Sequence, residues 1–166
     1  MTKGTVLVAV GTLFRLGLAA VWLVSGWLKA SDPNQTFIAV QAYDVLPGGV
    51  VSVVAGAMPF LELALGALLL VGLGTRLTAV LSGVVLLVFI AAVAQSWARG
   101  LSIDCGCFGG GGQVAAGDTR YPQEIARDTG FLVMAVWLAI RPRTWLAVDG
   151  RLGGGAAEPV SGKVGT

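Results

Sequence analysis

Cys105 and Cys107, the only two cysteines of the chain, lie one glycine apart in the segment DCGCFGGGG, residues 104–112. Two thiols at this spacing can serve as a redox-active dithiol, as a structural disulfide or as a pair of soft metal ligands. A structural disulfide would stabilise the fold weakly, since closing so short a loop contributes about 1.6 kcal/mol of loop entropy. The tight ring, which Gly106 suits because glycine tolerates positive φ, would also be easily reduced. We therefore favour a redox role.

The residues around the pair leave the other roles open. Zinc or Cu(I) would accept thiolates, but the chain has no histidine, so a partner would have to supply further ligands. Asp104 beside the pair would disfavour the thiolate, accept its proton or hydrogen-bond its own backbone as a turn residue. A nearby cation would favour the thiolate instead, and the candidates are Lys29, Arg99 and Arg127.

The elements that must position the thiols are apolar helices. The chain of 166 residues is 55% hydrophobic and 12% charged, with a mean hydropathy of +0.82. Four stretches approach or exceed the roughly 20 residues that cross a bilayer: residues 5–28, 49–73, 77–97 and 122–140. We predict an all-α integral membrane protein, with a four-transmembrane-helix bundle over residues 1–143 and a short interfacial helix around 37–43. The Gly-rich residues 144–166 predict a disordered cytoplasmic tail.

The basic residues predict the orientation of this bundle. Four crossings place both termini on one side, with six of the eleven cations there and four on the other: Lys3, Arg76, Arg141, Arg143, Arg151 and Lys163 against Lys29, Arg99, Arg120 and Arg127. The positive-inside rule makes the termini cytoplasmic and the cysteine loop extracytoplasmic, where disulfides persist. A net charge of +2 does not indicate nucleic-acid binding.

Arg15 and Glu62 are the ionisable residues well inside the predicted spans, where an unpaired charge is costly. If Thr5 lies opposite Leu73, the two side chains reach a similar depth, so we expect them to pair. Each belongs to a helical stripe of polar and small residues: Gly11, Trp22, Gly26 and Lys29 with Arg15, and Pro59 and Gly66 with Glu62. These stripes would line a quinone pocket or proton path, or else form helix contacts.

The cysteine count limits the route of electrons. Thiol exchange across the membrane would need a second pair on the cytoplasmic side, and the chain has none. Electrons must then leave to an extracytoplasmic protein, to a small oxidant or to a quinone, which is the candidate cofactor.

Four segments give the chain a resemblance to the MauE branch of the MauE/DoxX membrane proteins. They are FRLGLAAVWLVSGWLKASDP, PFLELALGALLLVGLGTR, CGCFG and ARDTGFLVMA, the last holding Arg127 and Asp128. The resemblance implies a four-helix protein of the bacterial inner membrane, associated with disulfide formation in exported proteins and with a thioredoxin-like partner. The wider family includes quinone-linked proteins. In the case that gives the family its name, the protein that benefits is methylamine dehydrogenase.

We therefore expect a membrane thiol:disulfide oxidoreductase component with Cys105 and Cys107 as its catalytic pair. Lys29, Arg127 and Asp128 would tune the loop, with Asp104 and Gly106 supporting it, while Arg15 and Glu62 would hold the bundle or relay protons. One alternative is an accessory or assembly subunit of a larger membrane complex, with a structural disulfide. Another is a metal or cofactor delivery module.

Overall fold

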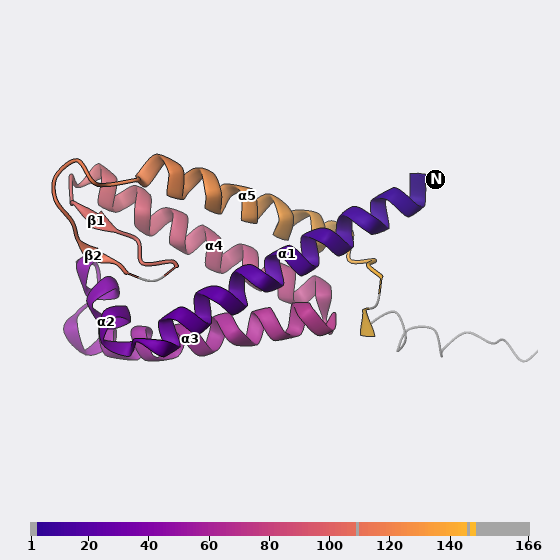
Figure 1. The fold of residues 1–166 in the computed structure, drawn as a ribbon, viewed down its shortest axis with the longest axis horizontal. Coiled ribbons are helices and arrows are strands. Elements are labelled where there is room, and N and C mark those ends of the chain that lie inside the picture. Colours follow the sequence, from indigo (N-terminus) through magenta and orange to yellow (C-terminus); the bar gives the residue numbers. More distant parts are fainter. Residues whose placement is uncertain (1–2, 109, 146, 149–166) are drawn as a thin grey trace, which may run out of the picture.

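The computed structural model describes residues 3–108, 110–145 and 147–148 (Figure 1). Its helices are α1 (Lys3–Ser31), α2 (Pro33–Ala42), α3 (Gly48–Val71), α4 (Thr75–Ala98) and α5 (Tyr121–Ile140), and its strands are β1 (Ile103–Asp104) and β2 (Gly112–Gln113). Each of the four apolar stretches forms a long helix, as predicted. The short helix expected around 37–43 is α2, and it begins earlier because Asp32 caps it by accepting the Gln35 amide at 3.0 Å.

Three of the described helices are long and apolar enough to cross a membrane: Gly4–Ser31, Gly48–Val71 and Thr75–Ala98. Helix α5 has 20 residues, but Glu124, Arg127 and Asp128 lie in its first half and lower its hydropathy. A membrane protein with three candidate spans is therefore established, while the fourth crossing and the side on which the termini lie stay predictions.

The helices form two main pairs. Helix α1 packs along α3, and α4 packs along α5, which also contacts α1. Figure 1 shows α2, β1 and β2 together at one end of the bundle and the N-terminus at the other. Trp145 also lies at the N-terminal end, because its amide donates to Thr12 Oγ1 at 2.9 Å. Residues 144 and 145 of the predicted tail thus reach α1, whereas 146 and 149–166 lie outside the described residues.

The outer surface of the bundle is apolar, unlike that of a water-soluble domain. Large apolar side chains face outward, with Phe60 and Ile140 each 71% exposed. Charged and hydroxyl side chains lie inside, among them Arg15, Ser25, Lys29, Glu62, Ser82 and Asp128. One of them links two helices, since Trp22 Nε1 donates to Ser82 Oγ at 3.0 Å. This arrangement suits a protein surrounded by lipid, where polar groups must find their hydrogen-bond partners within the protein.

Glycines bring α1 and α3 into close contact. A Cβ on Gly26 would lie 2.9 Å from the Pro59 carbonyl oxygen, and one on Gly66 would lie 2.7 Å from Leu23 Cγ. Side chains at these positions would push the two backbones apart. Gly26 and Gly66 of the predicted stripes therefore lie where α1 and α3 touch.

Candidate functional site

The cysteine pair follows β1 in a short turn at the end of the bundle. Strand β1 pairs with β2, with Asp104 opposite Gly112. Asp104 Oδ1 accepts the Gly106 amide at 3.0 Å, which is the turn role weighed for it above. Gly106 has φ +67°, a left-handed conformation that favours glycine. These contacts reverse the chain between the two cysteines and turn both sulfurs to one side.

The two sulfurs are in direct contact. Their Sγ atoms lie 2.7 Å apart, and the residues are only 8% and 9% exposed. Both are free cysteines in the structure. Because a disulfide needs about 2.05 Å between its sulfurs, a small movement of Cys105 and Cys107 would join them. The two cysteines are thus close enough to form a disulfide with little movement.

The surroundings distinguish the two thiols. The hydrogen bond from Cys107 lowers the pKa of Cys105, and the Cys107 amide, 3.3 Å from Cys105 Sγ, lowers that pKa further. Arg127 Nη2, at 3.7 Å, acts in the same direction. The pKa of Cys107 is raised well above its usual value, first by its hydrogen bond to Cys105 and then by burial. Of the two, Cys105 therefore loses its proton more readily.

A buried polar cluster holds the turn on the helices. The Cys107 carbonyl oxygen lies 2.6 Å from Ser25 Oγ and accepts from Lys29 Nζ at 3.1 Å. Lys29 also donates to the two carboxylate oxygens of Glu62, at 2.9 and 3.0 Å, while Ser25 Oγ lies 2.8 Å from Glu62 Oε2. The charge of Glu62, fully buried in α3, thus fixes the two groups that hold the Cys107 carbonyl.

The predicted pairing of Arg15 with Glu62 is wrong. Glu62 pairs with Lys29, whereas Arg15 donates to the carbonyls of Leu69 and Leu70 at 2.8 and 3.1 Å, and to that of Trp145 at 2.9 Å. The assumed register fails because α1 continues past the end of α3 (Figure 1). Arg15 therefore meets the unpaired carbonyls of the last turn of α3, where a cation is favourable. Glu62 lies two turns away, about 10 Å nearer the cysteine loop.

Arg127 and Asp128, predicted as supporting residues, lie together beside the pair. Arg127 Nε donates to Asp128 Oδ1 at 2.9 Å, and its guanidinium carbon lies 4.9 Å from the centre of the Phe108 ring. This salt bridge and ring contact hold the guanidinium near Cys105 Sγ. Helix α5 therefore supplies a cation 3.7 Å from Cys105 Sγ.

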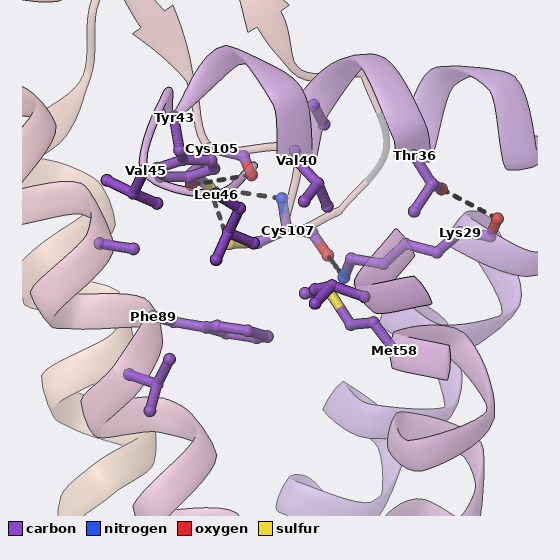
Figure 2. A pocket seen from close by; sticks show the side chains of 15 residues that line it. Lys29, Thr36, Val40, Tyr43, Val45, Leu46, Met58, Phe89, Cys105 and Cys107 are labelled. Atoms are coloured by element: carbon purple, nitrogen blue, oxygen red, sulfur yellow. Dashed lines mark hydrogen bonds between the residues drawn. The ribbon is translucent and has the colours of Figure 1, made fainter. Parts of the chain in front are cut away.

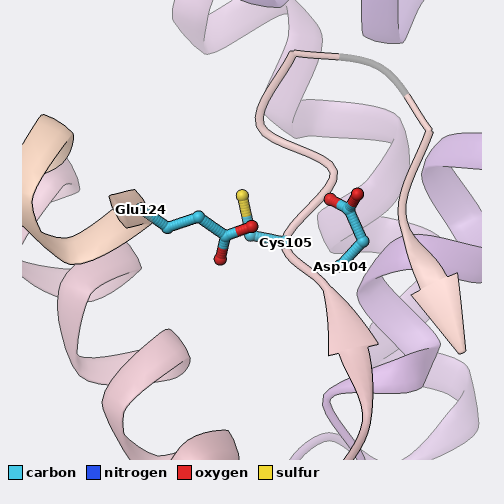
Figure 3. A group of neighbouring side chains, drawn as sticks. All are labelled: Asp104, Cys105 and Glu124. Atoms are coloured by element: carbon cyan, nitrogen blue, oxygen red, sulfur yellow. The ribbon is translucent and has the colours of Figure 1, made fainter. Parts of the chain in front are cut away.

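Glu124 is a site residue that was not identified from the sequence. Its carboxylate, Asp104 and Cys105 offer one ligand atom each, all within 4.8 Å of one another (Figure 3). Glu124 is 8% exposed, and its Oε2 has no hydrogen-bond partner among the described residues. This oxygen can accept the proton that Cys105 loses. The same three groups could also ligate a cation.

Three other residues that hold the cysteine loop were not identified from the sequence: Tyr43, Tyr121 and Ser25. Tyr43 donates its hydroxyl proton to the Cys105 carbonyl at 3.1 Å, and Tyr121 donates to the Leu101 carbonyl at 2.7 Å. Ser25 lies one helical turn before Lys29, so its i,i+4 spacing was the one pattern that could have drawn attention to it. Tyrosines flanking a loop are too common to single out.

Substitution of Gly106 tests the geometry of the turn. A Cβ at Gly106 would lie 2.9 Å from Ala39 Cβ and 3.1 Å from the Gly110 carbonyl oxygen. Gly110 has a similar φ of +71° but nothing within 4 Å of its would-be Cβ. Both alanine variants should lose about 1 kcal/mol of stability to the left-handed backbone, and Gly106→Ala should lose clearly more. Thermal unfolding in detergent measures both, and equal losses would contradict this packing.

Comparison with known families gives one match. The family model described as Methylamine utilisation protein MauE matches residues 7–141. That range includes α2 to α5, nearly all of α1 and the whole cysteine loop. No curated protein and no solved structure matches the chain in the corresponding comparisons.

Proposed function

Since the chain belongs to the MauE family, whose membership indicates a redox-associated membrane protein, we propose that it is a membrane thiol:disulfide oxidoreductase component. Cys105 and Cys107 are its redox pair, and they exchange disulfides with an extracytoplasmic thioredoxin-like protein. We place the chain in the bacterial inner membrane, with the cysteine loop on the exported side, where it serves the maturation of exported proteins.

One observation carries this proposal. Two cysteines lie in contact, 2.7 Å apart, with the pKa of one lowered by the hydrogen bond from the other. A purely structural bridge gains nothing from a stabilised thiolate, whereas thiol exchange depends on it. The contribution of such a short loop to stability is also small.

The exchange has defined steps. A thiolate of the partner attacks the sulfur of Cys105 in the Cys105–Cys107 disulfide, and Cys107 leaves and takes up a proton. The second thiol of the partner then loses its proton and attacks the partner's own sulfur in the mixed disulfide. The partner leaves oxidised, and Cys105 leaves as the thiolate because the thiol with the lower pKa is the better leaving group. Arg127 stabilises the Cys105 thiolate, and Glu124 exchanges a proton with Cys105.

A redox titration of the purified protein in glutathione and dithiothreitol buffers tests this function. We expect Cys105 and Cys107 to interconvert with a midpoint in the range of thiol oxidoreductases, between about −120 and −270 mV. In an accessory subunit with a structural disulfide, the disulfide would stay oxidised even when the buffer potential falls below about −300 mV. That result would reject the proposal.

The pH dependence of alkylation tests the assignment of the thiolate. Because the pKa of Cys105 is lowered, its reaction with iodoacetamide should persist to a lower pH than that of an ordinary thiol. In Cys107→Ser the hydroxyl still donates a hydrogen bond to Cys105, so the midpoint of the pH profile of Cys105 alkylation should stay low. Cys107→Ala removes this donor and should move that midpoint to higher pH. Identical profiles for the two variants would show that the contact does not set the pKa.

The cluster of Asp104, Cys105 and Glu124 favours a second candidate, a metal delivery module. Two carboxylates beside the thiolate would supply ligands that the cysteine pair lacks. Stoichiometric zinc or copper in the reduced protein, lost on Glu124→Gln, would support this function over thiol exchange.

A further inference from the structure

An apolar pocket lies directly beneath the cysteine turn. It has a volume of about 200 Å³ and is bounded by α2, α3, α4 and the turn itself. Figure 2 shows Cys105 and Cys107 at one end, with Phe89 of α4 below them and Met58 of α3 across the space. The pocket exists because α3 packs mainly on α1 and α4 mainly on α5, so the two helices separate beyond their connecting turn (Figure 1).

The walls of the pocket select an apolar ligand that comes from the membrane. Val88 on α4 and Val45 after α2 line it and are 59% and 52% exposed, so its rim belongs to the apolar outer surface of the bundle. The polar groups of Lys29 and Thr36 are already hydrogen-bonded within the protein. The pocket is therefore open to a lipid-soluble molecule and offers little to a polar one.

Its size fits a small ring system. An apolar cavity of about 150 Å³ accommodates benzene, so one of about 200 Å³ accommodates a substituted one- or two-ring head group. Phe89 provides an aromatic surface for such a ring. A lipid acyl chain would fit the walls equally well, but it could not take electrons from the thiols that form one end.

We propose that this pocket binds the ring of a membrane quinone, which oxidises the reduced Cys105–Cys107 pair. The proposal rests on the proposed function. The quinone would be the acceptor for the electrons that the cysteine pair takes from its partner. It also places the quinone between α2, α3 and α4 rather than along the Arg15 and Glu62 stripes of the sequence analysis.

The reaction balances without another reactant. The two sulfurs of Cys105 and Cys107 lose two electrons and two protons and form one disulfide bond. The quinone takes both electrons, and its two carbonyl oxygens take two protons, giving the hydroquinone. The proton that Cys105 gives up reaches the quinone through Glu124 or solvent, whereas the Cys107 thiol transfers its proton as its sulfur is oxidised.

Binding is tested first in a protein that cannot react. The double variant Cys105→Ser, Cys107→Ser is titrated in detergent with a short-tailed benzoquinone or naphthoquinone, and thermal unfolding is followed. The ligand should raise Tm in a saturable manner, because it binds only the folded state. Adding Ala92→Phe, which fills the pocket from α4, should abolish the shift. Ala91→Phe, one residue earlier on the exposed surface, should preserve it.

Electron transfer is tested next with the reduced protein under anaerobic conditions. One quinone should be reduced per protein with formation of one disulfide, and Ala92→Phe should slow this reaction about tenfold or more while Ala91→Phe leaves it unchanged. A normal glutathione titration without saturable quinone binding or reduction would overturn the pocket proposal alone. Equal behaviour of the two phenylalanine variants would overturn it as well. A pair that stays oxidised in dithiothreitol at potentials below about −300 mV would instead refute the proposed function.

Discussion

Cells that produce the Cys107→Ser variant are expected to accumulate a covalent complex with the exchange partner, whereas cells that produce Cys105→Ser should accumulate about tenfold less or none. The remaining Cys105 keeps its lowered pKa, because serine still donates a hydrogen bond and Arg127 stays 3.7 Å from the sulfur. It therefore attacks a disulfide of the partner, and no second thiol is present to release the complex. Cys107 alone is buried and faces the charge of Asp128, both of which raise its pKa.

The complex is identified on non-reducing gels after acid quenching and alkylation. It should disappear with dithiothreitol and be missing from the double variant Cys105→Ser, Cys107→Ser. A stronger complex with Cys105→Ser would reverse the assigned roles of the two cysteines. No dithiothreitol-sensitive complex with either variant would contradict exchange with a protein partner.

Glu62→Gln is expected to destabilise the protein by about 3–5 kcal/mol, the cost of leaving one charge of a buried ion pair without its partner. Lys29 is 7% exposed and Glu62 is fully buried, so water cannot replace the lost carboxylate. The loss should reach the cysteine turn, because Lys29 and Ser25 hold the Cys107 carbonyl. We therefore expect altered alkylation of Cys105 together with a lower Tm in detergent.

The exposed ion pair between Arg99 and Asp44 provides the matched control. Its side chains are 40% and 79% exposed, so Asp44→Asn should cost at most about 1 kcal/mol. Combining Lys29→Met with Glu62→Gln removes both buried charges and should recover much of the lost stability. A loss in Glu62→Gln no larger than that in Asp44→Asn would show that the buried cluster does not hold the site.

The sequence predicts the long elements well, because twenty consecutive apolar residues leave few alternatives to a helix. It also predicts the local chemistry of the turn, where the backbone of Gly106 and the side chain of Asp104 act within three residues. Helix α5 shows the limit of this reasoning. Its helical pattern is clear, but its charged first half means that length and hydropathy alone do not establish it as a span.

Features that depend on the packing of helices were harder to predict. The pairing of Arg15 failed because hydropathy does not define the register of α1 against α3, and a different register gives Glu62 a different cation. Glu124 was missed because its position in a first helical turn already has a common explanation. The pocket beside Phe89 depends on the separation of α3 and α4, which follows from their contacts with other helices.

The redox state of Cys105 and Cys107 in growing cells shows whether the pair cycles between disulfide and dithiol on the exported side. Cells are quenched with acid, free thiols are alkylated with a mass-labelled maleimide, and the fraction of protein with a Cys105–Cys107 bridge is measured before and after a dithiothreitol pulse. We expect the pulse to reduce the bridge and the bridge to re-form within minutes of its removal. A membrane-impermeant maleimide should reach the reduced thiols from the exported side. A pair that stays in one state throughout, or that is reached only from the cytoplasm, would contradict the proposed function.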